Sequence, residues 1–286
     1  MRKTSRRYRR YINAVEQLRS FHEGKEPIGY NDKIKWLLVN DQMPEHVICC
    51  DKFLCRAYVA GRVGENSLRK IYHVAETVSG IRLDLLPDTF VIKANHDSGS
   101  VYRVTDRHSW TRARKKLRKS LKNRFYGLRG AEWAYWYIRP RVFAEEMMMG
   151  PIVDYKFHCC DGKICWVQII YDRDSGHPRE VNVDEDNNPL SLHLDQNFIF
   201  EVEPPDAPEP WNEMKELARS LSRGFKYVRV DLYAYLGEPS FGELTFWPRA
   251  GDYHTEDNLE FGNLLNIDTS WRRPSIHDFF THDPIG

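Results

Sequence analysis

The chain has 286 residues, 41% hydrophobic and 13% aromatic, a composition that excludes a disordered chain and allows a sizeable core. It carries 42 Lys and Arg against 41 Asp and Glu, so its net charge gives no overall attraction to nucleic acid or to an anionic membrane. No run approaches the roughly 18–20 apolar residues of a membrane span, and the basic N-terminus lacks the apolar stretch of a secretory signal. We therefore expect a cytoplasmic protein without a membrane span.

The N-terminal part of the chain contains two predicted helices and one ambiguous segment. Apolar residues at helical spacing predict a basic amphipathic helix over residues 8–21. A second helix is predicted to begin at Asn31 or Asp32, because either side chain can serve as the N-cap. Residues 47–60 mix strand and helix patterns, so their structure stays open at this point.

Two short strands are predicted at residues 90–94 and 101–104. The polar segment 95–100 between them contains Gly99, and this pattern predicts a hairpin. Its tip is of a size that suits a phosphate group.

Residues 110–124 combine a high positive charge with an apolar stripe. Eight of the thirteen residues from 112 to 124 are Lys or Arg, which fits a nucleic-acid surface. Apolar residues nevertheless recur at helical spacing, at positions 110, 113, 117 and 121. This spacing indicates a helix with one buried face and a solvated basic face, and we favour that interpretation over a nucleic-acid groove.

Further strands are predicted at residues 141–145, 155–160 and 163–170. An Asp-Gly pair joins the last two, which is a strong hairpin signal. The acidic, Pro-rich segment 203–210 predicts a loop, and apolar spacing predicts a helix over residues 211–221.

The six cysteines form two clusters of identical internal spacing, at positions 49, 50 and 55 and at positions 159, 160 and 165. A metal or disulfide site built from both clusters is one interpretation. Neither cluster has the spacing typical of structural zinc. We favour reduced, buried cysteines on strands, since Cys is among the most buried residue types.

The segment from residue 225 to residue 247 predicts a second hairpin, centred on Gly237. Alternation places Phe241, Glu243, Thr245 and Trp247 on one face of its second strand. A turn at Gly237 sets Asp231 opposite Glu243 and Arg229 opposite Thr245, with opposed Cβ atoms about 4.5–5.5 Å apart.

Two carboxylates at this separation allow two interpretations. They can hold Mg²⁺, which takes one or two carboxylates together with phosphate oxygens and water, while Arg229 clamps phosphate oxygens. Alternatively, Arg229 neutralises Asp231 and Glu243 on a solvated sheet face. The hairpin alone does not decide between them.

In their order along the chain, these segments resemble an ATP-grasp enzyme, an α+β fold in which two α+β subdomains clasp ATP. The ordered matches from residue 51 onward are Asp51-Lys52 with Arg56, residues 90–100, residues 142–147, Asp154-Tyr155-Lys156, Arg229-Val230-Asp231 and Glu243-Leu244-Thr245. Over residues 30–265 the chain is similar to the TupA-like branch, named for a teichuronopeptide biosynthesis protein. The branch signatures are matched by residues 33–37, Asn40-Asp41, residues 51–53, Lys93-Ala94-Asn95-His96, residues 154–157 and residues 241–246.

The resemblance implies a role for each matching residue. It assigns ATP phosphates to Lys52, Lys93 and Lys156, lid contacts to Ser98, Gly99 and Ser100, the adenine edge to Glu145, Glu146 and Met147, and ribose to Asp154. It assigns Mg²⁺ to Asp231 and Glu243, and transition-state charge to Arg229 with Lys156. Candidate substrate contacts are Arg56, His96, Arg173, Thr245, Arg249 and Gly251. Two positions depart from the pattern, because Thr245 replaces an Asn ligand and Asp97 replaces a loop Gly.

The same resemblance predicts the organisation of the chain. An N-terminal helical/αβ segment spans residues 1–88, a small lid subdomain 89–145, a large subdomain with the metal hairpin 146–265, and a C-terminal extension 266–286.

The implied function is an ATP-dependent carboxylate–amine ligase that acts through an acyl phosphate. Its partners would be a small-molecule or saccharide carboxylate, such as a uronic acid or a peptide-like polymer in surface-polysaccharide biosynthesis, and an amine or amino acid. A sugar or polyol kinase and a basic nucleic-acid binder are the alternatives, and the oligomeric state stays open.

Overall fold

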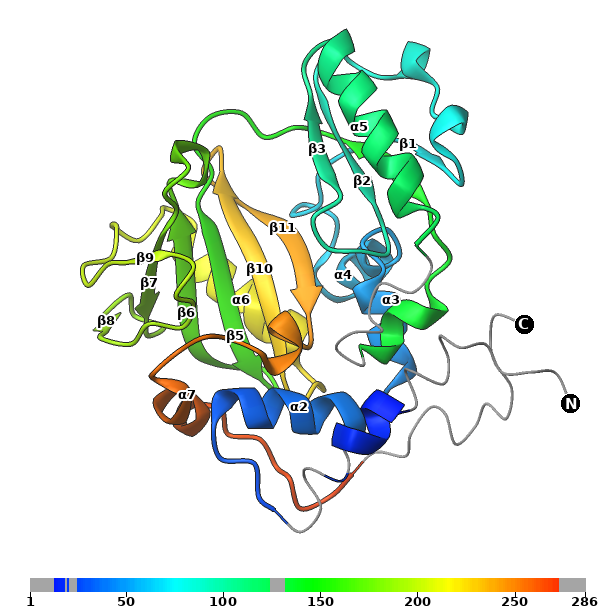
Figure 1. Ribbon diagram of the computed structural model, residues 1–286. Coiled ribbons are helices and arrows are strands. Elements are labelled where there is room, and N and C mark those ends of the chain that lie inside the picture. The colour runs from blue at the N-terminus through cyan, green and yellow to red at the C-terminus, as the bar shows by residue number, and fades with distance from the viewer. Residues whose placement is uncertain (1–12, 19, 21–24, 124–131, 273–286) are drawn as a thin grey trace, which may run out of the picture.

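The computed structural model describes residues 13–18, 20, 25–123 and 132–272, and it contains two antiparallel-rich sheets with helices packed on them (Figure 1). Most of the predicted helix 8–21 lies outside the described residues, although residues 13–18 are helical. Within the described part of the chain, no helix is long and apolar enough to cross a membrane.

The smaller sheet has four antiparallel strands in the order β1-β4-β2-β3. Their bounds are β1 Ile71–Ala75, β2 Phe90–Ala94, β3 Val101–Val104 and β4 Val142–Glu145. The hairpin predicted for residues 90–104 is confirmed, since β2 pairs with β3. Strand β1 precedes residue 88, so this sheet takes one edge strand from the N-terminal segment.

One face of the smaller sheet is covered by α5 (Arg107–Ser120) (Figure 1). Ala113 and Leu117 of this helix are buried against Phe90, Ile92 and other apolar residues of the sheet. The predicted apolar stripe is therefore confirmed. The helix begins three residues earlier than the pattern indicated, because Asp106 caps it by accepting a hydrogen bond from the Ser109 amide at 2.6 Å.

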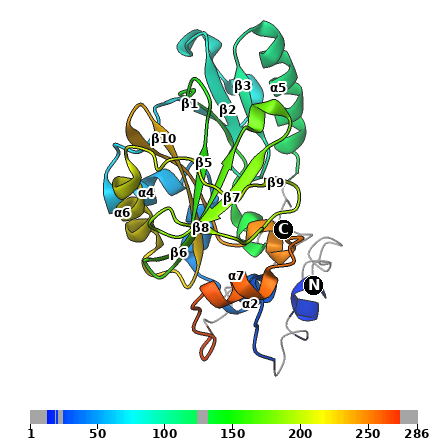
Figure 2. The ribbon, with the colours of Figure 1, turned by 90° about the vertical axis from the view of Figure 1, so that its left-hand side faces the viewer.

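The larger sheet has seven strands, in the order β11-β10-β5-β6-β7-β8 with β9 parallel to β7. Their bounds are β5 Asp154–Cys160, β6 Lys163–Tyr171, β7 Arg179–Val183, β8 Pro189–Leu190, β9 Ile199–Phe200, β10 Val228–Tyr235 and β11 Glu238–Thr245. The strands predicted at residues 155–160 and 163–170 are confirmed and form a hairpin. Figures 1 and 2 show the smaller sheet above this one, with α7 and α2 at the opposite end.

The remaining α-helices pack around the larger sheet. They are α2 Tyr30–Asn40, α3 Pro44–Cys50, α4 Cys55–Val63, α6 Trp211–Ser222 and α7 Asn258–Leu264. The predicted helix 211–221 is thus confirmed, and segment 203–210 lies outside regular elements. Short 3₁₀ turns occur at Val78–Gly80, Leu83–Leu85, Trp133–Tyr137, Arg173–Ser175 and Pro248–Gly251.

The start of α2 corrects the predicted N-cap. The helix is capped by Gly29 without a side-chain bond, and both Asn31 and Asp32 lie inside its first turn. The Asn31 amide instead donates to Asn258 Oδ1 at 2.9 Å, while the Asn31 side chain bonds the backbone of Tyr253. A contact from 227 residues away thus replaces the local cap that the sequence suggested.

The cysteines are all free. The prediction that both clusters lie on strands is wrong for the first cluster, which lies on helices. Cys49 and Cys50 end α3 and Cys55 begins α4, because residues 47–60 form two helices and no strand. Cys159, Cys160 and Cys165 do lie on strands. Across the described ranges, no group of three or more His, Cys, Asp or Glu residues is placed to hold a metal ion.

A candidate active site between the two sheets

A cleft of about 900 Å³ opens between the two sheets and takes its lining from both. Its cationic side chains are Lys52, Arg69, Lys93, Arg103, Lys156 and Arg173. Its anionic side chains are Asp154, Asp172, Asp174, Asp231 and Glu243. The volume lies in the range of a small-molecule site, and the charged groups come from segments far apart in the sequence.

The β10–β11 hairpin places two carboxylates on the cleft side of the larger sheet. Asp231 is paired with Glu243, and Arg229 with Thr245, as the sequence predicted. The turn itself is two residues long, because Tyr235 is paired with Glu238. On its own, this turn would set Asp231 opposite Gly242.

A β-bulge at Gly242 restores the register, since Leu232 is paired with Phe241 but Asp231 with Glu243. The bulge also moves Phe241 to the core face of the strand, and Phe241 and Leu244 both belong to the main hydrophobic core. The prediction that Phe241 shares a face with Glu243 is therefore wrong. Trp247 does not share that face either, because it lies beyond the end of β11 and is buried in the core. A Cβ atom at Gly242 would lie 2.8 Å from the Asp231 carbonyl oxygen, so this bulge requires glycine.

Asp231 is buried among cations. Arg229 Nε lies 2.6 Å from Asp231 Oδ1, and Arg229 Nη2 lies 2.7 Å from Oδ2. Lys156 Nζ also lies 2.7 Å from Oδ2, because Lys156 occupies the paired position on the neighbouring strand β5. Burial lowers the pKa of Arg229, but the adjacent charge of Asp231 outweighs it and raises that pKa well above its ordinary value.

Glu243 extends this charged group toward the N-terminal helices. Its Oε2 lies 3.0 Å from Lys52 Nζ, and its Oε1 lies 3.8 Å from Arg229 Nη2. Burial raises the pKa of Glu243, but the charges of Lys52, Arg229 and Lys156 dominate and lower it to about 2. Glu243 is therefore ionised at every physiological pH.

The smaller sheet contributes a second ion-pair cluster. Glu145 at the end of β4 pairs with Lys93 Nζ at 2.5 Å and with Arg69 Nη2 at 3.0 Å. Burial lowers the pKa of Lys93 although Glu145 opposes this. Arg69 was not a predicted site residue, because it belongs to an irregular segment without any motif. Arg69 lines the cleft, and the segment that carries it is bonded to β11, where the Phe241 amide donates to the Ser67 carbonyl at 2.8 Å.

The loop 95–100 is tied to the end of α5. Asp97, at the position where a glycine was expected, accepts hydrogen bonds from the hydroxyls of Ser100 and Ser120. Ser98 and Gly99 line the cleft, whereas Ser100 is buried. His96 turns away to the Ser120 carbonyl, at 3.2 Å, and is not part of the cleft lining.

Asn95 forms hydrogen bonds to two other segments of the chain. The sequence motif contains this residue but gave it no role. Its backbone carbonyl accepts from the Lys52 amide at 3.0 Å. Its side-chain amide donates to Asp51 Oδ2 at 2.8 Å and to the Arg139 carbonyl at 3.0 Å, and its Oδ1 accepts from the Arg141 amide at 2.6 Å. Asn95 therefore joins the lid strand, the entry to β4 and the segment that carries Lys52.

Other candidate residues fall into two groups. Asp154, Arg173 and Met147 line the cleft, and the Arg173 guanidinium donates to Asp154. Glu146 does not line the cleft, and its backbone amide donates to the Lys70 carbonyl at 2.9 Å.

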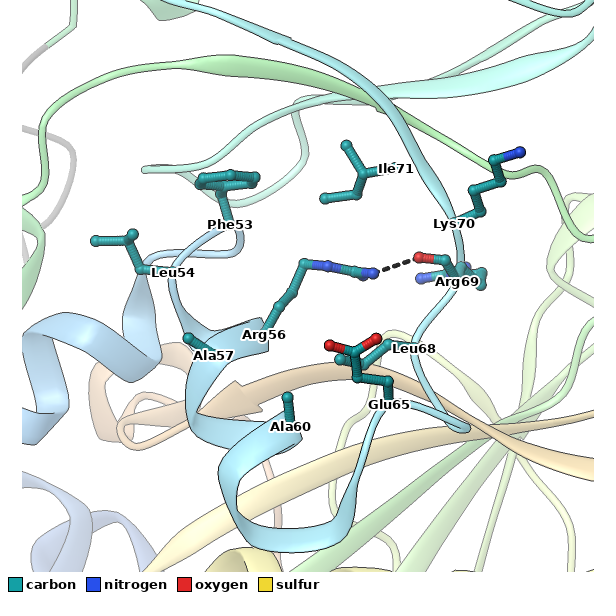
Figure 3. A pocket seen from close by; sticks show the side chains of 10 residues that line it. All are labelled: Phe53, Leu54, Arg56, Ala57, Ala60, Glu65, Leu68, Arg69, Lys70 and Ile71. Carbon is teal, nitrogen blue, oxygen red and sulfur yellow. Dashed lines mark hydrogen bonds between the residues drawn. The ribbon is translucent and has the colours of Figure 1, made fainter.

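The candidate substrate residues are more scattered. Thr245 accepts from Arg229 at 3.2 Å, whereas Arg249 is paired with Asp195 at 2.6 Å outside the cleft lining. Gly251 is buried next to α2, where a Cβ atom would lie 2.7 Å from the Asn31 carbonyl. Arg56 lies in a separate, adjoining pocket (Figure 3).

Comparison with known proteins agrees with this geometry. The family model of TupA-like ATP-grasp proteins matches residues 32–266, most of the chain. The chain belongs to the TupA-like ATP-grasp family. Membership establishes the α+β ATP-grasp fold, whose two sheets face each other across the cleft.

This TupA-like protein is also similar to solved structures of ligases. D-alanine–D-alanine ligase from Bacillus anthracis, complexed with ATP, is 17% identical, with 76% of this chain and 63% of that chain covered at a TM-score of 0.42. L-amino acid ligase from Bacillus licheniformis is 16% identical, with 90% and 62% covered at 0.49. This chain thus spans less than two thirds of the length of either ligase. No curated protein matches it significantly.

The donor set of the TupA-like protein fits Mg²⁺. Asp231 and Glu243 both line the cleft and are directly opposed on adjacent strands. Both offer hard carboxylate oxygens, and Mg²⁺ characteristically takes one or two carboxylates and completes its shell with phosphate oxygens and water.

Proposed function

We propose that this TupA-like protein is an ATP-dependent carboxylate–amine ligase that acts through an acyl phosphate. The observation that carries the proposal is the Asp231–Glu243 pair, opposed on one hairpin and contacted by Lys52, Lys156 and Arg229. Family membership and the cleft volume support it further. The proposed subdomains are residues 89–145 together with strand β1, and residues 146–265. The rest of segment 1–88 precedes them, and residues 266–286 follow.

In the proposed reaction, a substrate carboxylate oxygen attacks the γ-phosphorus of ATP, and the bond to the β-phosphate oxygen breaks to release ADP. The amine then attacks the acyl phosphate carbon, inorganic phosphate leaves, and an amide with one proton lost from nitrogen remains. Such phosphoryl transfer depends on positioning and on charge stabilisation. The chain supplies both with fixed cations and needs no covalent side chain.

Each cation has a proposed task. Lys52 and Lys156 neutralise phosphate oxygens next to the hairpin, and Lys93 does so from the lid. Arg229 is held in one orientation by two bonds to Asp231, and it also donates to Thr245 and to the Tyr253 hydroxyl. One N–H group of its Nη1 is left to stabilise charge that develops on the transferred phosphoryl group. Mg²⁺, held by Asp231 and Glu243, would supply further neutralisation of phosphate oxygens.

The lid and the opposite wall of the cleft have proposed tasks as well. Backbone N–H groups of Ser98 and Gly99 contact the phosphates, and Met147 packs against the adenine. Asp154 binds the ribose. The position of these four residues in the cleft lining supports the assignment.

The substrate class follows from the family resemblance. We propose a uronic acid or a peptide-like polymer as the carboxylate and an amino acid or small amine as the nucleophile, in surface-polysaccharide or related biosynthesis in the cytoplasm. This assignment is a pathway analogy and is tested separately from the chemistry.

Product analysis tests the proposal directly. The protein is incubated with Mg²⁺, ATP and pairs of uronic acids and amino acids, and mass spectrometry identifies the products. ADP together with an amide supports the ligase, whereas a phosphoester would assign a kinase. Hydroxylamine in place of the amine traps an acyl phosphate as a hydroxamate.

Charge-removal variants test the site. Arg229→Ala, Asp231→Ala and Glu243→Ala are each expected to lower turnover by about 10²-fold or more. Arg82→Ala is the matched control, because Arg82 forms an exposed ion pair with Asp84 at 2.5 Å outside the cleft lining. Full turnover in the Arg229, Asp231 and Glu243 variants would refute the assignment.

A further inference from the structure

A second pocket of about 440 Å³ lies beside the cleft, between α4 and the segment that leads into β1 (Figure 3). Its apolar lining consists of Phe53, Leu54, Ala57, Ala60, Leu68 and Ile71. Its charged lining consists of Arg56, Arg69, Lys70 and Glu65. The pocket therefore combines an apolar wall with an excess of positive charge, a combination that suits a small anion with an apolar body.

Arg56 is the polar group at the centre of this pocket. Figure 3 shows its side chain extending from α4 across the pocket, where the guanidinium donates to the Arg69 carbonyl. It is half-buried, and burial lowers the pKa of Arg56. Among residues 25–123 and 132–272, no carboxylate lies within ion-pair distance of it. A guanidinium has five N–H donors, so most donors of Arg56 stay available to a ligand.

Arginine in such a setting selects for planar anions. Its fork of N–H groups matches a carboxylate in a bidentate arrangement. Burial strengthens such a pair, because the local dielectric is lower than in bulk water. The apolar residues around Arg56 would contact the body of the same ligand.

The pocket adjoins the site of the proposed phosphoryl transfer. Arg69 lines both the pocket and the cleft. Phe53 of the pocket directly follows Lys52, whose ammonium contacts Glu243 at 3.0 Å. A ligand bound at Arg56 is consequently a neighbour of the phosphate-binding cations.

We propose that this pocket binds one of the two ligase substrates, a small carboxylic acid with an apolar body, through its carboxylate on Arg56. The role as a substrate site rests on the proposed ligase function, whereas carboxylate binding itself does not. The ligand is either the acid that is activated or an amino acid that serves as the amine, and both present the same carboxylate to the pocket.

Binding measurements test the pocket with three probes of matched shape. They are 4-methylpentanoate, L-leucine and the neutral 4-methylpentanamide, each titrated by ligand-observed NMR at millimolar concentration. At least one of the two carboxylates is expected to bind the wild-type protein, and the amide is expected to bind at least about tenfold more weakly. Equal affinity for the amide, or no binding of either carboxylate, would overturn the proposal.

Three variants locate the binding. Arg56→Gln is expected to weaken carboxylate binding at least about tenfold, and Ala57→Trp to abolish it by filling the pocket. Arg62→Gln is the matched control, because Arg62 belongs to the same helix but donates to the Ser220 and Arg223 carbonyls outside the pocket. Unchanged carboxylate affinity in Arg56→Gln would overturn the proposal.

ATP binding and turnover separate this proposal from the ligase function. All three variants are expected to bind ATP with wild-type affinity. Arg56-dependent carboxylate binding without any ATP turnover would refute the ligase and retain the pocket. Where the wild type forms a hydroxamate from 4-methylpentanoate, a raised KM for that acid in Arg56→Gln assigns the pocket to the activated acid. If Arg56→Gln loses binding of L-leucine but not of 4-methylpentanoate, the pocket is assigned to the amine substrate.

Discussion

Replacement of Asn95 by alanine would remove three hydrogen bonds from a buried side chain. The bonds go to Asp51, to the Arg139 carbonyl and to the Arg141 amide, at 2.8, 3.0 and 2.6 Å. Asn95 is fully buried, so water would not replace these partners without entering the core. The substitution therefore breaks the junction between the lid strand, the entry to β4 and the segment that carries Lys52.

The expected loss of stability follows from the same three bonds. Each contributes about 1 kcal/mol net, and a buried acceptor left without its donor costs about 1–3 kcal/mol more. The Asp51 carboxylate would be that acceptor. Burial already raises the pKa of Asp51, and its remaining hydrogen bonds from the Phe53 and Leu54 amides offset this only in part. We expect Asn95→Ala to lower the free energy of unfolding by about 4 kcal/mol.

Urea unfolding followed by tryptophan fluorescence measures this loss. Asn66→Ala is the matched control, because Asn66 is exposed, and it is expected to change stability by less than about 0.5 kcal/mol. Asn95→Asp is expected to cost at least as much as alanine near neutral pH, since it places a second carboxylate against Asp51. A loss below about 1 kcal/mol in Asn95→Ala would refute the reasoning.

Three further changes test other parts of the structure. Burial raises the pKa of Glu132 to about 7, so between pH 4.5 and about 7 the folded state retains a proton that the unfolded state loses. The contribution of Glu132 to the free energy of unfolding therefore falls across this range. In Glu132→Gln, urea unfolding across this range is expected to lack this fall of about 3 kcal/mol; an unchanged profile would contradict the assignment. Gly242→Ala places Cβ 2.8 Å from the Asp231 carbonyl oxygen and is expected to lower the free energy of unfolding by about 1–3 kcal/mol. A variant as stable as the wild type would contradict the requirement for glycine at this bulge. Glu243→Gln is expected to raise the Mg²⁺ concentration for half-maximal ATP turnover about tenfold or more, and an unchanged Mg²⁺ titration would remove Glu243 from the metal site.

The sequence correctly predicted that Asp231 lies opposite Glu243, but the prediction did not include the bulge on which this pairing depends. Alternation and the turn at Gly237 set Asp231 opposite Glu243. In the structure this pairing needs both a two-residue turn and the bulge at Gly242. One residue of register exchanges the two faces of a strand, so the pattern alone also placed Phe241 on the wrong face.

The residues that escaped prediction are held by contacts far apart in the chain. Asn95 bonds Asp51 across 44 residues, and Asn258 completes the first turn of α2 across 227 residues. Local patterns carry no information about such partners, because they arise when separate elements pack. Lys52, Lys93 and Glu145 were accessible from the sequence only as parts of an ordered family motif.

The ion pairs of the cleft have a consequence for how metal binding and nucleotide binding depend on each other. Lys52 and Lys156 contact the same two carboxylates that are proposed to receive the metal. A free Mg²⁺ ion would have to approach Asp231 and Glu243 against these neighbouring ammonium groups, and a free nucleotide would have to compete with the carboxylates for them. On the proposed site assignment, each ammonium would exchange a carboxylate for a phosphate when both ligands arrive together, and the carboxylates would become available to the metal. Metal and nucleotide affinities are then thermodynamically coupled, and each is expected to strengthen the other by the same factor.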